Sequence, residues 1–423
     1  MLEYIDLRYK PGSHDLLCEY YLEPNGMSIE KAAEHIAGES SIGTWTDLCT
    51  MNKEIAHRLK PRIYSIDAKS RLVKIAYPKE LFEERNMPQI LSSVAGNIFG
   101  MKAVSALRLE DISFPKSLVK SFPGPVYGID GIRKLAGVKK RPLVGTIVKP
   151  KVGLNADQHA KVAFDAWMGG VDIVKDDENL TSQRFNVFED RVKKTLEMRD
   201  EAEQITGERK FYMPNVTAET DEMITRAEFV KQHGGEYIMV DVLTVGWSGL
   251  QTLRNFDLKR VIHAHRAGHA ALTRNKRHGI SMLVLAKICR LIGVDQLHIG
   301  TIVGKMEGSQ LEVEETEDEI ESRFFHPKKS AHALEQDWLD IKPVFAVCSG
   351  GLHPGLLPQL VDMLGNNIIC QFGGGLFGHP SGAFAGARAI RQSLDATMKK
   401  IPLKRYAESH PELRQALDYF SSP

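Results

Sequence analysis

From about residue 140 onward, short β-branched and apolar runs alternate with amphipathic stretches. This alternation is typical of repeated strand–helix units that build a parallel sheet. Eight apolar runs begin at Pro142, Val171, Lys210, Tyr237, Arg260, Gln296, Val344 and Ile368. Eight units over about 260 residues match the usual size of a (β/α)8 TIM barrel, so we expect this α/β fold in the C-terminal part of the chain.

The segments between these runs predict helices, because apolar residues recur in them every three or four positions. The predicted helices cover residues 157–167, 189–205, 222–232, 281–292, 356–364 and 383–398. The acidic run at 313–322 predicts only a solvated loop or helix face, and residues 404–423 predict one or two terminal helices.

Residues 1 to about 125 lack this regularity. They mix predicted strands at 16–24, 62–68 and 74–78 with predicted helices at 28–37 and 88–96. A cluster of turn-forming residues at 122–125, Phe-Pro-Gly-Pro, is expected to mark a domain boundary. The predicted organisation is therefore an α+β N-terminal domain (1–125) followed by a catalytic barrel domain with C-terminal helices (126–423).

Composition narrows the possible partners. The chain has 423 residues, and its 55 Lys and Arg almost balance its 54 Asp and Glu, so no overall field favours nucleic acid or a membrane surface. We find no basic leader and no apolar run of about 18 to 20 residues, which predicts a cytoplasmic location. The five cysteines form no CxxC pair, which argues against a zinc site or a disulfide framework.

One strand ends in an unusual cluster of charges. The segment GGVDIVKDDENL (169–180) places Lys175 beside Asp176, Asp177 and Glu178. Carboxylates such as Asp177 and Glu178 are the hard oxygen ligands that Mg2+ prefers. An ammonium group there would repel the cation, and an internal salt bridge at the end of a buried strand is the simplest alternative.

Polar groups and glycines also end five other predicted strands. In a barrel, functional groups gather at the carboxyl ends of the strands. The residues concerned are Lys149 and Lys151, then His265, Arg266 and His269, then His298 with Lys305 beyond it, then Ser349, Gly350 and Gly351, and finally Gly373, Gly374 and Gly375. Each has an ordinary structural explanation by itself, but their joint occurrence at one edge favours an active site.

The types of these residues predict a bisphosphate substrate. Glycines after the last two strands let backbone N–H groups approach one phosphate. Arg266 and His298 supply donors that suit a second phosphate. With Mg2+, such a site suits proton abstraction next to a carbonyl. Lys149 and Lys175 are both candidate bases, and Lys305, set among glycines, has the composition of a mobile lid.

The segments GGVDIVKDDEN, GTIVKPKVGL, HAHRAGHAA, LHIGTIVGKMEG, SGGLHPG and FGGGLFGHPSG together resemble the signature segments of one family. This family is the large subunit of ribulose-1,5-bisphosphate carboxylase/oxygenase (RuBisCO). The N-terminal segments ESSIGTW and GNIFGM extend the resemblance over nearly the whole chain, which looks most similar to the archaeal form III enzymes.

The resemblance offers a solution to the problem of Lys175. It implies that this lysine reacts as a neutral amine with CO2 and becomes a carbamate, which is an anionic metal ligand. Lys175, Asp177 and Glu178 would then hold Mg2+, and the carbamate would remove the C3 proton. Asp176 alternates to the other face of the strand and need not be a ligand.

Further roles follow from the resemblance alone. Lys149 would move protons at C2 with support from Lys151, His265 would assist enolisation and hydration, and Lys305 would stabilise the new carboxylate. Substrate-binding residues would be Arg266, His298 and Ser349 around one phosphate and its neighbouring hydroxyls, and Thr44, Trp45, Gly351, Gly373 and Gly374 around the other, with Gly350 also binding the substrate. Glu39 and Asn97 would reach the site from a partner subunit, which requires a homodimer or an assembly of dimers.

The implied activity is the conversion of ribulose 1,5-bisphosphate, CO2 and water into two 3-phosphoglycerate molecules, with O2 as a competing substrate. The implied context is nucleotide salvage, and no small subunit is expected. One alternative is a RuBisCO-like enolase or isomerase of a methylthio-sugar phosphate, and another is a non-catalytic sugar-phosphate sensor. Ile147, Gly268 and Leu376 depart from the plant-type pattern, but none of them is an expected metal ligand or base.

Overall fold

The computed structural model describes residues 3–420 except 45, 47, 304–309 and 328–331. Its contacts divide the chain into two compact units. The first consists of Met1–Gly124, Gly268–Gly293 and Ser322–Ile341, and the second of Pro125–Ala267, Val294–Glu321 and Lys342–Pro423. The domain limits 1–125 and 126–423 stay a prediction, since units defined by contacts take in separate stretches of chain.

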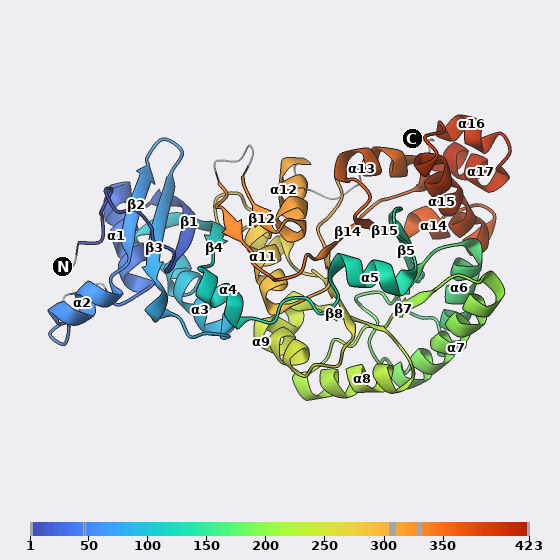
Figure 1. Ribbon diagram of the computed structural model, residues 1–423, viewed down its shortest axis with the longest axis horizontal. Helices are drawn as coiled ribbons and strands as arrows, with labels where there is room; N and C mark the ends of the chain where they lie inside the picture. The colour runs from blue at the N-terminus through green and yellow to red at the C-terminus, as the bar shows by residue number, and fades with distance from the viewer. Residues whose placement is uncertain (1–2, 45, 47, 304–309, 328–331, 421–423) are drawn as a thin grey trace. The chain divides into compact units, whose positions relative to one another are not determined.

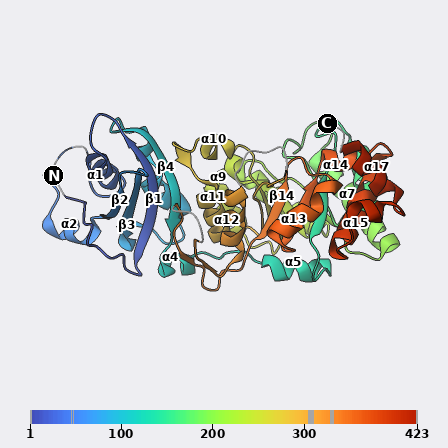
Figure 2. The ribbon, with the colours of Figure 1, turned by 90° about the horizontal axis from the view of Figure 1, so that it is seen from above.

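The first unit contains a five-stranded sheet in the order β10-β4-β1-β3-β2. The strands are β1 (Asp15–Pro24), β2 (Arg62–Asp67), β3 (Leu72–Pro78), β4 (Val104–Ser113) and β10 (Gly279–Ile280). All pairs are antiparallel except β10 with β4, and Figure 2 shows β1 beside β4. The predicted strands of this unit are confirmed, but β4 was not predicted.

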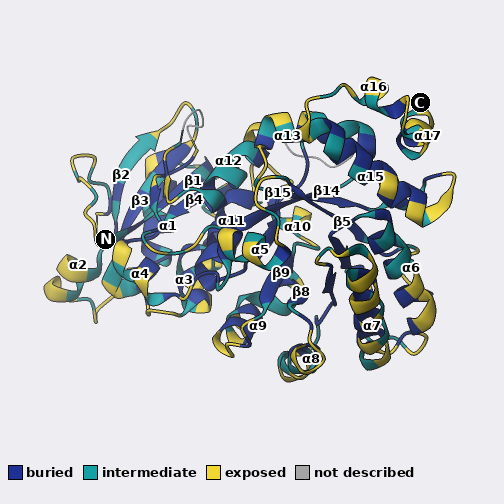
Figure 3. Ribbon diagram, turned by 45° about the vertical axis from the view of Figure 1, so that its right-hand side comes forward, coloured by how far each residue is buried: buried dark blue, intermediate teal, exposed yellow. Residues whose placement is uncertain are grey.

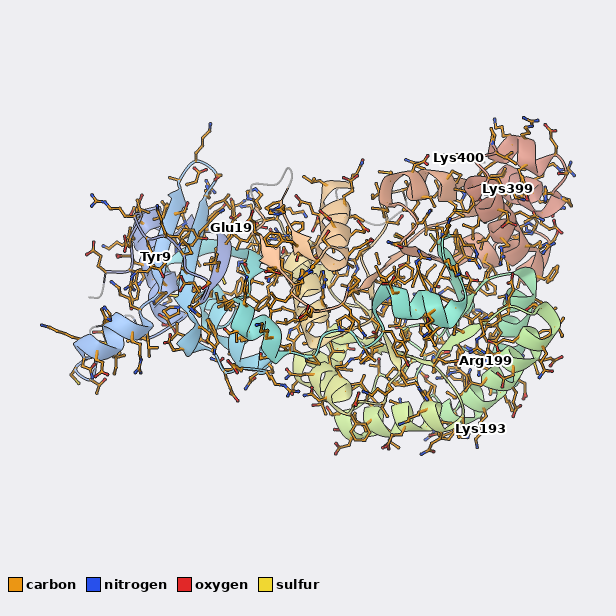
Figure 4. All side chains as sticks on the ribbon, viewed as in Figure 1. Tyr9, Glu19, Lys193, Arg199, Lys399 and Lys400 are labelled. Carbon is orange, nitrogen blue, oxygen red and sulfur yellow. The ribbon has the colours of Figure 1, made fainter. Side chains whose placement is uncertain are left out.

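Strand β4 escaped prediction because it carries charged residues that are nevertheless buried. Asp111 accepts hydrogen bonds from Lys287 Nζ (2.8 Å) and from the Leu334 amide (2.6 Å), and the Asp111 and Lys287 side chains are both fully buried. On neighbouring strands, buried Glu19 pairs with Lys74 at 2.9 Å (Figure 4 labels Glu19). Buried charges require such partners, and a sequence does not show them.

The helices of the first unit include three that were predicted, at 28–37, 88–96 and 281–292. They are α1 (Ile29–Glu39), α2 (Lys53–Leu59), η1 (Lys79–Leu81), α3 (Met87–Val94), η2 (Asn97–Gly100), α4 (Lys116–Ser121), α10 (Ala270–Thr273) and α11 (Met282–Ile292). A short ribbon of β12 (Phe324–Phe325) and β13 (Gln336–Asp337) completes the described part of this unit. The N-cap side chains of Ser28, Asn52, Asn86 and Ser281 accept a backbone N–H of the first turn and so fix where four of these helices begin.

The second unit is built on eight parallel strands in the order β7-β6-β5-β15-β14-β11-β9-β8. Figure 1 labels β5, β7, β8, β14 and β15 among them. The eight strands are β5 (Leu143–Ile147), β6 (Ile173–Lys175), β7 (Phe211–Met213), β8 (Tyr237–Asp241), β9 (Val261–His265), β11 (Gln296–His298), β14 (Phe345–Ser349) and β15 (Ile368–Phe372). A parallel bridge between Asn215 and Met239 joins β7 to β8 and closes the barrel. All eight predicted strands, and the α/β barrel fold, are confirmed.

Helices surround these strands, and Figure 3 shows buried strands beside helices with exposed outer faces. The helices of this unit are α5 (Gly128–Ala136), α6 (Ala156–Gly169), α7 (Phe188–Thr206), α8 (Thr220–Gln232), α9 (Val242–Asn255), α12 (Gln310–Glu321), α13 (Leu357–Leu364), α14 (Gly374–Phe377), α15 (Gly382–Met398), α16 (Leu403–Ala407) and α17 (Pro411–Phe420), with η3 (Pro354–Leu356) before α13. Helix α9 was not predicted, because Gly246 (φ 74°) interrupts its periodicity. The acidic run proves to lie in α12, which buries Val313 and Ile320.

The apolar core of the barrel is continuous with α5. Ile129 and Ile132 of this helix cluster with strand residues that include Leu143, Phe211 and Val347. Salt bridges tie the outer layer to the strands: Arg199 of α7, labelled in Figure 4, pairs with Glu236 just before β8 at 2.6 Å. The cysteines are free thiols, and no described helix is both long and apolar enough to cross a membrane.

Candidate active site

The carboxyl ends of the parallel strands bring the predicted polar residues to one edge of the barrel. Strand β6 ends at Lys175, which pairs in register with Ile147 of β5 and Met213 of β7. Lys149 follows β5 by two residues, and His265 is the last residue of β9. Residues from different parts of the sequence therefore meet because parallel strands share a direction.

Lys175 is enclosed by the barrel, and its side chain is 1% exposed. Its Nζ donates to the carbonyl oxygen of Asp176 (2.8 Å), lies 3.2 Å from Sδ of Met239 and lies 4.0 Å from Oε2 of Glu178. Burial lowers the pKa of Lys175, and the charges of Glu178 and Asp177 oppose this effect only in part. A close internal salt bridge is therefore not what holds this amine, and burial favours its neutral form.

The two neighbouring carboxylates are held by other cations. Asp177 Oδ2 accepts a hydrogen bond from Lys149 Nζ (2.7 Å), and Glu178 lies 3.7 Å from both Lys151 Nζ and His265 Nε2. Burial acts to raise the pKa of both acids, but the net shift is downward. Burial is the largest single cause at each acid, but the lowering causes together exceed it: the bond and charge of Lys149 lead them at Asp177, and the interactions with Lys175 and His265 lead them at Glu178. Both acids are thus ionised near neutral pH.

These residues suit a magnesium ion if one further anionic ligand is supplied. Among the described residues, no group of three or more His, Cys, Asp or Glu side chains is arranged to hold a metal. Asp177 and Glu178 alone offer two hard oxygen ligands, and Mg2+ usually takes one or two carboxylates together with water and substrate oxygens. A carbamate on Lys175 would add the missing charge at the same place.

Asp176 lies on the opposite face and belongs to a buried network that the sequence did not reveal. It accepts hydrogen bonds from the Tyr212 hydroxyl (2.6 Å), Arg191 Nε (3.1 Å) and the Asn215 amide (2.9 Å), and His159 Nε2 lies 3.1 Å away. Burial opposes ionisation of Asp176, but Arg191 and His159 lower its pKa below the usual range. The network fixes the backbone that carries the two candidate metal ligands.

Histidines occupy the other side of the barrel mouth. His265 Nδ1 is bonded to Asp241 Oδ1 (2.8 Å), and His298 Nδ1 is bonded to Ser349 Oγ (2.8 Å). A further bond joins Nε2 of His298 to Nε2 of His263 (2.9 Å), so both ring nitrogens of His298 are engaged within the protein. Asp241 and His263 were not predicted, although both lie in predicted strands that end at this site.

Arg266 and several glycines complete this side. Burial lowers the pKa of Arg266 to about 10. Gly300 has a φ of +98°, a left-handed conformation that favours glycine, and a Cβ there would lie 2.7 Å from Nη2 of Arg266. Gly350 and Gly351 have φ values of +114° and +77°, which expose backbone after β14.

The last strand meets the first at the same edge. Thr146 Oγ1 of β5 donates to the carbonyl of Phe372 in β15 (2.6 Å). Gly373 follows, and a Cβ at this position would lie 3.4 Å from Cε of Lys149. Gly374 begins α14, and nothing lies within 4 Å of the position of its Cβ. The predicted phosphate-binding residue Gly373 therefore lies close to the lysine that contacts Asp177, and open space surrounds the Cβ position of Gly374.

The predicted N-terminal residues come together within the first unit. Asn97 Nδ2 donates to Glu39 Oε1 at 3.4 Å, and both residues lie at helix ends. Thr44 lines a cavity of about 470 Å³. Trp45 and Lys305, which the sequence also assigned to the site, lie outside the described residues.

Comparison with known proteins gives the same picture over the whole chain. Residues 3–118 match the family described as ribulose bisphosphate carboxylase large chain, N-terminal domain, and residues 128–420 match its catalytic domain. The ribulose bisphosphate carboxylase of Methanocaldococcus jannaschii is 54% identical over 99% of this chain and 100% of its own length. That of Pyrococcus furiosus is 49% identical over 99% of this chain and 97% of its own.

Solved structures agree with these sequence matches. The dimeric archaeal Rubisco of Hyperthermus butylicus superposes with a TM-score of 0.94, at 46% identity over 98% of both chains. The octameric ribulose-1,5-bisphosphate carboxylase/oxygenase of Pyrococcus horikoshii, in complex with a sulfate ion, gives a TM-score of 0.92 at 47% identity. It covers 99% of this chain and 96% of its own.

Proposed function

The chain belongs to the ribulose bisphosphate carboxylase large-chain family, and we propose that it converts ribulose 1,5-bisphosphate, CO2 and water into two 3-phosphoglycerate molecules. As a member of this family it is a carboxy-lyase. The observation that carries the proposed mechanism is the enclosed amine of Lys175, whose pKa is lowered by burial next to ionised Asp177 and Glu178.

Activation begins with the neutral amine. Nζ of Lys175 forms a bond to the carbon of CO2 and loses one proton, which gives a carbamate anion. Burial assists this step, because only the unprotonated amine has the electron pair that attacks CO2. The residue then changes from a cation that would repel Mg2+ to an anion that attracts it.

The resulting ligand set is the carbamate of Lys175 with Asp177 and Glu178. Bound Mg2+ would stabilise the negative charge that develops on the substrate oxygens during enolisation. The carbamate accepts the C3 proton. His265 is oriented for proton transfer by its bond to Asp241, and Lys149, which contacts Asp177 at 2.7 Å, moves protons at C2.

Two groups of residues bind the substrate phosphates in this proposal. Arg266 supplies a fixed charge, Ser349 contacts the adjoining hydroxyls, and His298, whose two ring nitrogens bond Ser349 and His263, takes part in binding by holding Ser349. Backbone N–H groups around Gly351, Gly373 and Gly374 bind the other phosphate. Lys151 supports Lys149, and Gly350 gives the turn after β14 its shape. Trp45 and the lid lysine Lys305 keep their predicted roles in substrate binding and carboxylate stabilisation.

We also propose that two chains combine to complete each site, because the family resemblance assigns Glu39, Thr44 and Asn97 to substrate binding and all three belong to the first unit. The related archaeal enzymes named above are dimeric and octameric. O2 would compete with CO2 for the enolised substrate. Nucleotide salvage is the proposed source of the substrate, and the cytoplasm is the proposed location of the protein.

Incorporation of 14CO2 into acid-stable product tests this function. Preincubation with bicarbonate and Mg2+ should raise the initial rate, and the labelled product should be 3-phosphoglycerate. Enolisation of ribulose bisphosphate without that product would instead favour the isomerase of a methylthio-sugar phosphate. Ligand binding that needs neither CO2 nor Mg2+, with no turnover, would favour a sugar-phosphate sensor.

A further inference from the structure

A chain of hydrogen bonds runs from the interior of the barrel to the substrate side. Gln296 Oε1 is bonded to Nδ1 of His263 (2.8 Å), Nε2 of His263 to Nε2 of His298 (2.9 Å), and Nδ1 of His298 to Oγ of Ser349 (2.8 Å). Gln296 and His263 are fully buried, and His298 is 3% exposed. Only the serine end reaches the barrel mouth.

The two histidines linked by these hydrogen bonds, His263 and His298, are uncharged. Burial is the main cause that lowers the pKa of His263 to about 3, and burial together with His263 and His265 lowers the pKa of His298 well below its usual value. A neutral imidazole has one N–H donor and one unprotonated acceptor nitrogen. The direction of one bond in the chain therefore fixes the direction of all the others.

The amide of Gln296 sets that direction. The amide oxygen of Gln296 faces His263. Burial raises the pKa of the Tyr237 hydroxyl, and the nearby amide of Gln296 opposes part of that rise. Neither Gln296 Nε2 nor the Tyr237 hydroxyl makes a hydrogen bond of normal geometry within the described residues. With the amide in this orientation its oxygen can only accept, so Nδ1 of His263 carries the proton.

We propose that Gln296 and His263 are positioning residues that fix the tautomer of His298 and thereby the direction in which the Ser349 hydroxyl donates. Nδ1–H of His263 donates to Gln296, Nε2–H of His298 donates to His263, and the Ser349 hydroxyl donates to Nδ1 of His298. The serine oxygen then presents only lone pairs to the barrel mouth.

This arrangement selects for a hydroxyl donor at Ser349. A sugar hydroxyl can donate a hydrogen bond to the serine oxygen. A phosphate or carboxylate oxygen has no proton to donate, so its lone pairs and those of the serine oxygen would repel each other. The inference deepens the proposed function, because it rests on substrate contact by Ser349. It assigns to two buried residues, neither of which reaches the substrate, the recognition of one hydroxyl of the sugar chain.

The tautomers can be measured without any activity. Protein labelled with 15N-histidine is examined by magic-angle-spinning NMR, and the His298 signals are identified by their loss in His298→Gln. In the wild type, Nε2 of His298 should give a protonated, pyrrole-like signal and Nδ1 an unprotonated, pyridine-like one. The opposite pattern in the wild type overturns the inference, whether or not any variant folds.

Two variants test transmission along the chain. Gln296→Leu removes the group that accepts the proton of His263. The donors and acceptors of the remaining hydrogen bonds should therefore exchange roles, and the proton of His298 should move from Nε2 to Nδ1. Tyr237→Phe removes a hydroxyl on the other side of the amide and should leave the tautomer of His298 unchanged. An unchanged tautomer in Gln296→Leu, or a reversed one in Tyr237→Phe, contradicts the proposal.

Kinetics separate this inference from the proposed function. In Gln296→Leu, KM for ribulose bisphosphate should rise about 3- to 10-fold, the worth of one hydrogen bond, with kcat nearly unchanged. A fall in kcat at unchanged KM would contradict substrate positioning. If the wild-type protein shows the expected tautomers but no carboxylation, the proposed function is refuted. The direction of the hydrogen bonds is still established in that case.

Discussion

The two sides of the barrel mouth use opposite electrostatic solutions for their buried polar groups. On the side of β5 and β6, Lys149 and Asp177 form a close charged pair beside the amine of Lys175. On the side of β11 and β14, His298 is kept neutral and bonded to Ser349. In the proposed mechanism, carbamate formation on Lys175 supplies a ligand for a metal ion on the charged side, whereas the neutral side orients protons. Charge balance would then control activation on one side, and bond direction would control recognition on the other.

Removing the amine on the charged side should have the largest effect. Lys175→Met should reduce carboxylation by about 10³-fold or more, because no carbamate can form and the metal loses a ligand. The free energy of unfolding should stay the same or increase, since a buried amine is replaced by an apolar side chain of similar length. Activity is measured as fixed 14CO2, and stability by urea unfolding.

Lys161→Met is the matched control, because this lysine of α6 is 64% exposed and pairs with Asp165 on the same helix. It should leave activation by bicarbonate and Mg2+ intact. Substantial turnover by Lys175→Met would exclude the carbamate as metal ligand and base.

Breaking the network behind the charged side should cost stability. Asp176→Ala leaves Arg191 buried without its carboxylate, for which we expect a loss of about 3–5 kcal/mol in the free energy of unfolding. Asp157→Ala breaks the exposed pair with Lys194 and should leave the urea midpoint unchanged. Equal midpoints for the two variants would show that the network is not structural.

The neutral side should make stability depend on pH. Between pH about 6.5 and 3, unfolded His263 binds a proton that the folded protein excludes, so stability should decrease as the pH falls through this range. Each pH unit in that range corresponds to about 1.4 kcal/mol for one such group. His263→Phe should therefore flatten the plot of unfolding free energy against pH from 6 to 4. An unchanged slope would mean that His263 is already charged in the folded state.

The smallest expected effect concerns the packing of Arg266. Gly300→Ala adds a Cβ 2.7 Å from the guanidinium at a left-handed backbone position and should cost about 1–3 kcal/mol in urea unfolding. Gly100→Ala, where no atom lies within 4 Å of the added Cβ, is the control and should differ from the wild type by less than about 0.5 kcal/mol. Equal stability of both variants would show that neither the left-handed backbone nor the contact with Arg266 requires glycine at position 300.

Much of the fold could be predicted because the barrel strands are short apolar runs separated by periodic helices. The eight strands follow from that pattern, whereas β4 and α9 do not. In β4 the buried charge of Asp111 looks like surface sequence until Lys287, 176 residues away, is brought beside it. In α9, Gly246 interrupts the local periodicity on which such a prediction depends.

For the site, the sequence identified the residues at strand ends but not the groups that hold them. Asp177 and Glu178 follow β6 directly, so their position is local information. Asp241, which orients His265, and His263, which bonds His298, look like ordinary strand residues. Their roles depend on which strands are neighbours in the barrel.

The sequence by itself determined the family, the strand–helix order and the residues that end each strand, because these depend on local pattern and on motifs of adjacent residues. Only the tertiary structure decided that Lys175 is enclosed and its pKa lowered, that Asp176 joins Arg191, and that His298 has no free ring nitrogen. Burial and hydrogen-bond direction arise from groups far apart in the chain. They exist only once the barrel has closed.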